Sequence, residues 1–424
     1  MKSDTVIDTI EVAALTIGMH IHLDGGWLSH PFPRSSFKIS SLEQIATLRS
    51  LGLKRVRWSP QDSDFSHTTG SFEVAPPAPA PEPDTEPQTP SAESLHRAAL
   101  AAQRAALAAC ERQFAEAASA TKQIFDDVRT QPLDARRNAQ ALTRQLVDQM
   151  IGSQELCIRL LSEAAGDKTS AHALNVSVIS LLMGRNFNLS ETEMLDLGLG
   201  ALLHDVGKSE LPERYRHRDE HFSAAEHKLY ETHVSLGIAQ ARRMELAPGA
   251  SLVIAQHHEH IDGSGFPLRL QSDRTTVLSR IVAMVNRYDK LCNPANPAKA
   301  ITPHEAVALM FAQGKNKYDP AILGAFIKMM GVYPAGSVVQ LTDDRYAMVV
   351  GVNSSRPLKP RVLVHEVGVP REEALILDLE TTPGLGIRRS LKPMALPSRT
   401  LDYLSPRPRV SYYFESSADD ETAV

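Results

Sequence analysis

The sequence contains little cysteine: Cys110, Cys157 and Cys292 are the only three in 424 residues, and they stand far apart with no C-x-x-C spacing. This scarcity argues against a framework of disulfide bonds and against a zinc site built from cysteine. It fits a reducing compartment, so the cytoplasm is the expected location.

The sequence also lacks long hydrophobic runs and an excess of basic residues. No stretch approaches about 18 uninterrupted apolar residues, and Met1–Ile10 contains Asp4 and Asp8, so neither a membrane span nor a signal peptide is predicted. With 45 Lys and Arg against 50 Asp and Glu, the net charge is -5, which does not favour a nucleic acid polymer or an anionic lipid surface as a partner. An anionic ligand would have to be captured by a local site.

What the chain does contain is a series of segments with different patterns, within an overall composition that is ordinary for a globular protein. Residues 1–62 predict a small α/β domain: Ile17–Asp24 alternates like a strand, Ser40–Leu51 is an amphipathic helix, and Lys54–Trp58 is a second strand. Residues 63–91 are rich in proline, which predicts an extended linker.

Residues 92–131 are rich in Ala, Glu, Arg and Gln and predict a long helix that connects the linker to the rest of the chain. A plain solvated helix and a coiled-coil contact within a homodimer are equally compatible with this composition. The helix therefore leaves the oligomeric state open.

The second half of the chain changes from a helical to a β pattern. Residues 132–330 carry apolar residues at helical spacing, for example in Leu142–Leu161, and predict an all-helical core. Residues 331–404 contain short β runs separated by Gly, Pro and Asp-Asp, which predict a small β-rich extension. Residues 405–424 mix Pro, Arg and acids and are expected to be a disordered tail. The predicted fold class is mainly α, with a helical core between a small α/β domain and a β appendage.

Histidines and carboxylates recur along the predicted helical core. A single histidine in a helical protein is more often hydrogen-bonded or on the surface than bound to a metal, so only the set as a whole is informative. His257 and His258 are adjacent, and neighbouring residues of a helix point about 100° apart, so each ring can serve a different metal ion. The candidate ligands are His172, His204, Asp205, His233, His257 and His258.

The pair His204-Asp205 stands at the end of an apolar helix, where burial is costly unless a metal or a partner satisfies the two side chains. The carboxylate can bridge two ions while the imidazole holds one. Gly207 permits a sharp exit from the helix, and Lys208 puts a cation where a phosphate oxygen or leaving oxygen would lie. Further along, the loop Gly263–Pro267 contains two glycines whose backbone can approach a ligand closely.

These motifs, taken in order, resemble the HD-GYP domain, a subgroup of the HD metal-dependent phosphohydrolases that hydrolyses cyclic di-GMP. The resemblance covers roughly residues 142–330 and rests on five pieces of sequence. The N-terminal region also resembles a small domain of unassigned function that is often fused to these enzymes. The five pieces are His172–Val176, Leu202–Lys208, Glu231–His233 with Gly237, His257–Pro267 and Arg280–Leu291.

The resemblance implies a metal-dependent phosphodiesterase that opens cyclic di-GMP to linear pGpG, with onward hydrolysis to GMP left open. It implies that a hydroxide bridging two divalent ions, iron or manganese, attacks phosphorus, with His204, Asp205 and Lys208 as the catalytic residues. A diguanylate cyclase or another signalling protein is an expected partner, with the N-terminal domain regulating or docking the enzyme. The implied metal ligands are His172, His204, Asp205, His233, His257, His258 and Asn286, and the implied substrate contacts are Lys208, Gly263, Gly265, Phe266, Pro267 and Lys299.

Several positions depart from the family's pattern. Phe266 replaces the Tyr of the motif and keeps an aromatic face without the hydroxyl, and Lys168 replaces a Glu found in some members, which predicts two ions rather than three. Asn286 replaces a ligand Asp; its amide oxygen can coordinate, but one negative charge is lost and metal affinity should fall. Asp289 is interpreted as a structural carboxylate. After it, Lys299 alone keeps a charge that can contact phosphate.

Two other functions are also compatible with the sequence. A hydrolase of a different cyclic dinucleotide would use the same metal ligands, although the Gly263–Pro267 loop argues against it. A cyclic di-GMP receptor or signalling scaffold, with weak activity or none, would follow if the lost charge at Asn286 disables the metal site.

Overall fold

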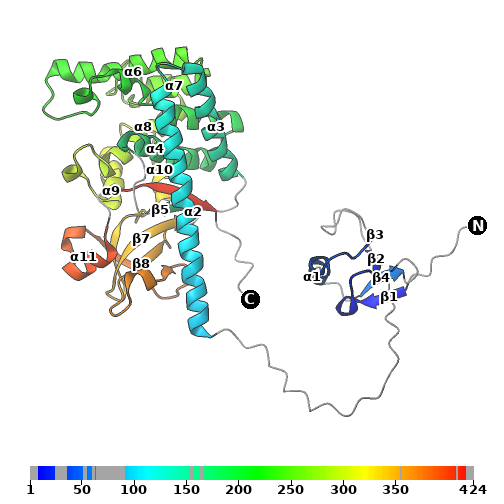
Figure 1. Ribbon diagram of the computed structural model, residues 1–424. Coiled ribbons are helices and arrows are strands. Elements are labelled where there is room, and N and C mark those ends of the chain that lie inside the picture. The colour runs from blue at the N-terminus through cyan, green and yellow to red at the C-terminus, as the bar shows by residue number, and fades with distance from the viewer. Residues whose placement is uncertain are drawn as a thin grey trace, which may run out of the picture. The chain divides into compact units, whose positions relative to one another are not determined.

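The structure is a computed structural model, and the chain forms two compact units, Met1–Gln88 and Thr89–Val424. The predicted fold class is confirmed: a mostly helical body carries an antiparallel sheet, and the N-terminal unit has a small sheet of its own (Figure 1). The proline-rich linker predicted for 63–91 lies outside the described residues except at its two end residues. The described residues are 8–23, 36–50, 55–59, 63, 91–151, 156–161, 167–353, 356–406 and 409–416.

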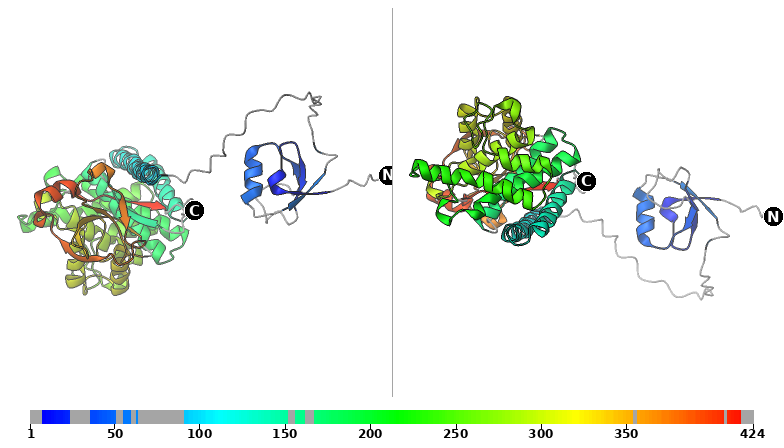
Figure 2. Two further views of the ribbon diagram at one scale, coloured as in Figure 1. Left: turned by 90° about the horizontal axis from the view of Figure 1, so that it is seen from below. Right: turned by 90° about the horizontal axis from the view of Figure 1, so that it is seen from above.

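The described residues of the N-terminal unit form an antiparallel sheet and one α-helix (Figure 2). Helix α1 (Leu42–Ser50) packs Ile45 and Leu48 against Ile21 and Val56 of the sheet. The strand, helix and strand predicted for this region are present as β2, α1 and β4, and the sheet contains two further strands, β1 and β3. In spatial order the strands are β1 (Asp8–Glu11), β4 (Arg55–Ser59), β2 (His20–His22) and β3 (Ser36–Lys38), and the short helix η1 (Val12–Ala14) follows β1.

The second unit is built mainly from helices. Several of them begin at a capping box, in which Ser190, Ser223 or Thr302 accepts a backbone N–H and a glutamate three residues later accepts the N–H of the cap. Among the residues that the structure describes, no helix is both long and apolar enough to cross a bilayer. The helices are α2 (Ala92–Asp127), α3 (Pro132–Ile151), α4 (Lys168–Asn186), α5 (Glu191–Leu203), α6 (Ala224–Arg243), α7 (Pro248–Gln256), α8 (Val277–Cys292), α9 (Pro303–Gln313), α10 (Pro320–Met330) and α11 (Ser398–Leu404), with 3-10 helices η3 (Val206–Glu210), η4 (Glu213–Tyr215), η5 (Ser272–Arg274), η6 (Pro297–Lys299), η7 (Arg371–Glu373) and η8 (Pro393–Ala395) between them.

An antiparallel sheet lies against these helices (Figure 1). Its main path runs β10-β6-β7-β5-β11, and β8 and β9 branch from β7. Residues 331–404 supply most of its strands, as predicted, but the sheet is not a separate appendage because it shares one hydrophobic core with the helices. The strands are β5 (Leu156–Leu160), β6 (Val338–Leu341), β7 (Tyr346–Asn353), β8 (Arg361–Val364), β9 (Ile376–Asp378), β10 (Ile387–Leu391) and β11 (Tyr412–Ser416).

Strand β5 corrects the prediction that 132–330 is all-helical. The helical pattern assigned to Leu142–Leu161 continues only to Ile151, where α3 ends, and Leu156–Leu160 forms a strand that is buried along its whole length. A short run that is buried on both faces has no alternation, so its periodicity cannot distinguish a strand from a buried helix. Only its pairing with β7 and β11 reveals it.

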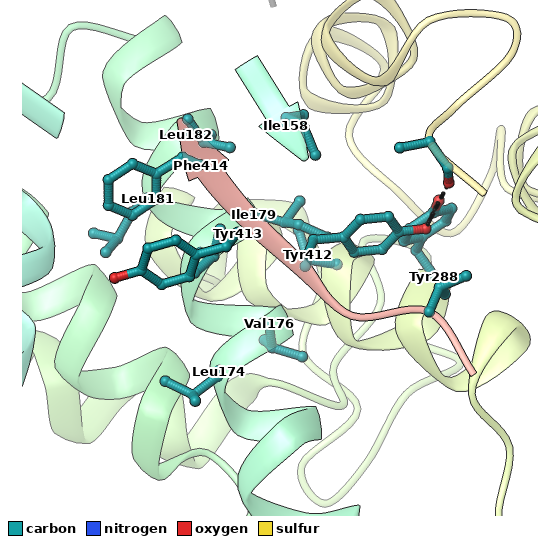
Figure 3. Packing of buried hydrophobic residues seen from close by; sticks show 14 of the residues in the cluster. Ile158, Leu174, Val176, Ile179, Leu181, Leu182, Tyr288, Tyr412, Tyr413 and Phe414 are labelled. Carbon is teal, nitrogen blue, oxygen red and sulfur yellow. Dashed lines mark hydrogen bonds between the residues drawn. The ribbon is translucent and has the colours of Figure 1, made fainter. Parts of the chain in front are cut away.

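Strand β11 corrects the prediction of a disordered tail at 405–424 for its central part, while 407–408 and 417–424 lie outside the described residues. Tyr412–Ser416 pairs antiparallel with β5, and Tyr412, Tyr413 and Phe414 are all buried. In Figure 3 the strand crosses α4, with Tyr412 pointing toward Tyr288 of α8 and Tyr413 pointing to the opposite side. The hydroxyls of Tyr412 and Tyr288 lie 3.0 Å apart. The prediction from composition failed here because Pro, Arg and acidic residues flank the aromatic residues in the segment 405–424. The three consecutive aromatic residues that lie in the strand were therefore not recognised as part of the core.

Helix α2 is not the plain solvated helix that was one of the two interpretations of residues 92–131. Its C-terminal half packs against α3, α4 and β11, with Phe114, Ala118 and Ile124 buried, and the ring of Phe114 meets that of Tyr413 at 6.3 Å. The predicted helix is therefore present, but much of its apolar face is covered by its own chain. The homodimer contact remains a prediction.

The buried cysteines give a first testable prediction. Cys110 and Cys157 are buried, and burial raises the pKa of each thiol to about 11. Because the thiolate is the reactive form, we expect the folded protein to react slowly with a thiol reagent at pH 8 and all three cysteines to react fast in urea. Counting modified thiols by mass spectrometry checks this, and fast labelling of either residue in the folded protein would contradict it.

Candidate metal centre

The predicted ligands come from five helices or their ends. His172 lies on the second turn of α4, His204 and Asp205 follow the end of α5, and His233 is in the middle of α6. His257 directly follows α7, in which the apolar run Leu252–Ala255 precedes the last residue, Gln256. Packing of α5 against α4 and α7, and of α6 against α7 and η3, brings these side chains to one place.

Asp205 lies at the centre of the group, where its two carboxylate oxygens face different histidines. Its Oδ2 is 3.3 Å from Nε2 of His204 and 3.6 Å from Nε2 of His172. Its Oδ1 is 3.5 Å from Nε2 of both His233 and His257. The donors thus form two sets that share Asp205: His172 and His204 on one side, and His233, His257 and His258 on the other.

Backbone carbonyls fix which nitrogen of each ring faces the centre. Nδ1 of His204 lies 2.7 Å from the carbonyl oxygen of Ala201, Nδ1 of His233 lies 2.6 Å from that of Tyr230, and Nδ1 of His257 lies 2.8 Å from that of Ile254. A carbonyl oxygen can only accept, so each Nδ1 carries the proton and each Nε2 turns a lone pair inward.

The inward lone pairs face each other at short range. Nε2 of His172 is 3.2 Å from Nε2 of His204, and Nε2 of His233 is 3.4 Å from Nε2 of His257. Two acceptors at such a distance repel unless a cation or a proton lies between or beside them. The donor set therefore fits divalent metal ions.

Charge and burial favour the same assignment. Burial lowers the pKa of His204 to about 4 and that of His233 to about 3, so both rings are neutral near pH 7, as a metal ligand must be. Burial opposes ionisation of Asp205, but the ammonium groups of Lys208 and Lys290 hold its pKa well below its ordinary value. The centre thus combines the neutral imidazoles of His204 and His233 with an ionised carboxylate. At His172 burial opposes the charged form, but hydrogen bonds to Asp205 and Asp289 raise the pKa of the ring.

Polar atoms left without a partner point to the same place. Within the part of the chain that the structure describes, Oδ1 of Asp205, Nε2 of His258 and Oδ1 of Asn286 are buried and make no hydrogen bond. Such atoms are rare in folded proteins because burying them unpaired is costly. Each is a good metal donor, and Asn286 lines the same cavity as the other two. Asn286 therefore fits the predicted ligand role.

The two predicted substrate lysines both have carboxylate partners. Nζ of Lys208 lies 2.6 Å from Oδ2 of Asp205, and Nζ of Lys299 lies 2.7 Å from Oε1 of Glu220. Both lysines line the cavity around the metal ligands. A phosphate that binds Lys299 would have to compete with Glu220.

The glycine loop lies beside the second set of donors. The ring of Phe266 stacks on that of His258 with centroids 4.4 Å apart, which supports the aromatic role predicted for this position. Gly263 has a φ of +74°, and a Cβ at Gly265 would approach the carbonyl oxygen of His258 to 2.4 Å. The loop therefore needs glycine at both positions.

The cavity around the ligands is large and cationic. It has a volume of about 1430 Å³ and is lined by Gly263, Gly265, Phe266 and Pro267 together with the metal donors. Twelve Lys and Arg side chains and seven Asp and Glu side chains line it, an excess of five positive charges in a chain whose net charge is -5. Such a cavity favours an anionic ligand.

Three residues of the site make contacts that were not predicted from the sequence. Asp289, interpreted as structural, holds Nδ1 of His172 at 2.5 Å. Lys290 places Nζ 3.7 Å from Oδ2 of Asp205; its position four residues after Asn286 on one helix face was the available signal. Glu259, part of the His-His-Glu sequence, is buried and accepts the backbone N–H groups of Leu268 and Leu270.

Glu259 gives a prediction about the loop. In Glu259→Gln, one amide NH₂ would face a backbone N–H, so a buried hydrogen bond is lost, and we expect a loss of about 1–3 kcal/mol in the free energy of unfolding. Urea unfolding measures this. Glu116→Gln, at an exposed position on α2, is the control and should change stability little. Equal stability of the two variants would contradict the proposed role.

Comparisons with known proteins agree with this geometry. Residues 149–322 match a model described as HD domain, and residues 7–139 match a domain of unknown function, DUF3391. The chain is 28% identical over 366 residues to "Cyclic di-GMP phosphodiesterase PA4108" of Pseudomonas aeruginosa, which covers 85% of each chain. It is 29% identical over 182 residues to "3'3'-cGAMP-specific phosphodiesterase 2" of Vibrio cholerae, which covers 42% of this chain and 35% of the relative.

Among solved structures, "Bd1817, a HDG"Y"P protein from Bdellovibrio bacteriovorus" aligns with 76% of this chain and 98% of its own, at 14% identity and a TM-score of 0.40. That similarity is too low to support an inference. The family assignment instead follows from the two matched domains, the curated relatives and the ordered motifs. The chain is an HD-domain phosphohydrolase with an N-terminal DUF3391 domain, and it is related to proteins that include cyclic di-GMP phosphodiesterases.

Proposed function

We propose that the protein is a metal-dependent phosphodiesterase that hydrolyses cyclic di-GMP to linear pGpG and can continue to GMP. The observation that carries this proposal is the set of inward Nε2 lone pairs arranged on both sides of Asp205. His172, His204, Asp205, His233, His257, His258 and Asn286 would hold two divalent ions, with iron or manganese as the best match to these donors. Bound ions would supply a nucleophile from water and neutralise charge on the phosphoryl oxygens.

The chain's own groups prepare the site for an anionic diester. Asp205 keeps the two donor sets together, and the buried carbonyl partners of the histidines prevent their rings from turning. Lys208 is held by Asp205 and lies 5.4 Å from the centre of the Tyr230 ring, so its ammonium is placed beside the centre to meet a phosphoryl or leaving oxygen. The cationic cavity is large enough to receive a second phosphate of the same substrate.

The test is turnover by the purified full chain loaded with Mn²⁺, or with Fe²⁺ under anaerobic conditions. We expect pGpG from cyclic di-GMP, and a loss on the order of 10³-fold in His204→Ala, since losing a ligand removes several kcal/mol of transition-state stabilisation. Cyclic di-AMP and 3'3'-cGAMP complete the substrate panel because one relative is named for the latter. If neither protein forms product from cyclic di-GMP, the proposal is wrong.

A second candidate is a receptor that binds cyclic di-GMP without hydrolysing it. The observation in its favour is that Asn286 contributes no negative charge while Lys290 adds a positive one close to Asp205. Both features weaken attraction for divalent ions. Calorimetry that finds tight binding of cyclic di-GMP, with no turnover in Mn²⁺ or Fe²⁺, would favour this candidate.

A further inference from the structure

We propose that the C-terminal segment Arg409–Ser416 is a positioning element of the metal centre. It would act through the side chains of Asn175 and Asn293, which connect its backbone to Asp289 and through Asp289 to His172. The inference deepens the proposed function and rests on it for the identity of the bound ions. We call the two asparagines and the backbone of Val410–Tyr412 the C-terminal clamp.

Asn293 makes the first half of the clamp. Its side-chain amide donates to Oδ1 of Asp289 at 2.9 Å and to the carbonyl oxygen of Val410 at 2.8 Å. Its own Oδ1 accepts the backbone N–H of Val410 at 2.9 Å. Both N–H groups and the oxygen of this amide are therefore engaged, and both backbone groups of Val410 are satisfied by it.

Asn175 makes the second half of the C-terminal clamp, from helix α4. Its amide donates to Oδ1 of Asp289 at 2.8 Å and to the carbonyl oxygen of Val410 at 3.0 Å, and its Oδ1 accepts the backbone N–H of Tyr412 at 3.1 Å. The same three kinds of contact thus occur twice, once from α4 and once from the residue that follows α8. Asn175 and Asp289 are buried.

Asp289 transmits this arrangement to the metal centre. Oδ1 of its carboxylate accepts from both asparagines, which leaves Oδ2 to hold Nδ1 of His172 at 2.5 Å. That contact turns Nε2 of His172 toward His204 and Asp205. Groups that orient a ligating histidine in this way typically change metal affinity by about 10–100-fold when removed.

The segment itself is anchored independently of the clamp. Beyond Val410, the backbone of Ser411 accepts the N–H of Leu161, and β11 pairs with β5 along five residues. Arg409, Val410 and Ser411 also line the cavity. The sheet therefore fixes the position of Val410. Through the hydrogen bonds of the clamp, Val410 in turn fixes the position of Asp289 and the orientation of the His172 ring.

The experiment compares two changes on the same part of the core. In Asn293→Ala, both contacts to Val410 and one to Asp289 are lost, and we expect about 10–100-fold weaker binding of one of two Mn²⁺ ions, measured by calorimetry without substrate. In Tyr288→Phe, the hydroxyl contact to Tyr412 is lost while Asp289 keeps its partners. This control should lower thermal stability and leave Mn²⁺ affinity unchanged.

A third variant covers a failure of Asn293→Ala to fold. Asn293→Asp keeps the size of the side chain and an acceptor for the N–H of Val410, but it loses the donors and faces Asp289 with a second carboxyl group. We expect at least the same loss of Mn²⁺ affinity as in the alanine variant. Rate measurements on cyclic di-GMP should show the loss in kcat at saturating substrate, with restoration at high Mn²⁺.

The possible results separate this inference from the proposed function. Wild-type Mn²⁺ affinity in a folded Asn293 variant, or an equal loss in Tyr288→Phe, would overturn the clamp. A wild-type chain that binds two ions but hydrolyses no cyclic di-GMP would overturn the proposed substrate, and the clamp would still be tested by its ion affinities. A wild-type chain that binds no divalent ion would overturn both.

Discussion

Replacing Asp205 with asparagine is expected to abolish phosphodiesterase activity and to leave at most one bound ion per chain. The carboxylate oxygens lie 3.3–3.6 Å from the Nε2 atoms of His172, His204, His233 and His257, so one side chain serves both donor sets. The amide of asparagine offers only one oxygen, and its NH₂ group would face inward lone pairs without the negative charge. A loss of several kcal/mol of transition-state stabilisation corresponds to roughly 10³-fold or more in turnover.

Metal content and turnover check this prediction together. Elemental analysis after dialysis gives ions per chain, and product formation from cyclic di-GMP gives the rate. Asp148→Asn, at an exposed position of α3, applies the same substitution away from the centre and should retain both values. Two ions per chain in Asp205→Asn would mean that the carboxylate does not bridge the site.

The second large effect is expected from Gly207→Ala. A Cβ at Gly207 would lie 2.0 Å from the carbonyl oxygen of His233 and 2.3 Å from the backbone nitrogen of Gly237. Both atoms belong to the backbone of α6, so relieving the clash requires η3 and α6 to move apart, and these elements position Asp205 and His233. Overpacking of this kind costs about 1–3 kcal/mol and occasionally more, and we expect the upper end because no side chain can turn away.

Gly324→Ala is the matched control for this prediction. A Cβ at Gly324, on α10, would meet no atom within 4 Å, so the substitution should raise stability by about 0.5–1 kcal/mol through the helix propensity of alanine. Urea unfolding of both variants measures the difference, and metal content reports the displacement of His233. A Gly207→Ala protein with normal stability and normal metal content would show that η3 and α6 are not held so closely.

The residues proposed as metal ligands could be selected from the sequence because their chemistry is visible in short motifs. His204-Asp205 and His257-His258 are adjacent pairs of costly polar residues at the ends of apolar helices, and such pairs need a shared partner wherever the fold brings them. The sequence alone did not show that Asp205 lies between the two sets. That arrangement comes from the packing of η3 against α6.

Contacts between distant segments were the part that could not be predicted. Nothing near Leu156–Leu160 indicates that its partners are Tyr346–Asn353 and Tyr412–Ser416, because strand pairing leaves no local periodicity in a run that is buried on both faces. Asp289 was interpreted as a structural carboxylate, but its contacts with His172 and Asn175 could not be predicted, since both residues lie more than 100 positions earlier in the chain. The ion pair between Lys299 and Glu220 likewise depends on how a loop folds back.

The place of β11 at the very end of the described chain has a consequence for biosynthesis. Its partner β5 is synthesised about 250 residues earlier. During translation the hydrophobic core therefore lacks the side chains of Tyr412 and Tyr413 until these residues have been synthesised. Pairing over such a sequence distance is also slow because a long loop must close first. The helices are therefore expected to stay incompletely packed until β11 is available, and a nascent chain should acquire its metal ions only after Ser416 has left the ribosome.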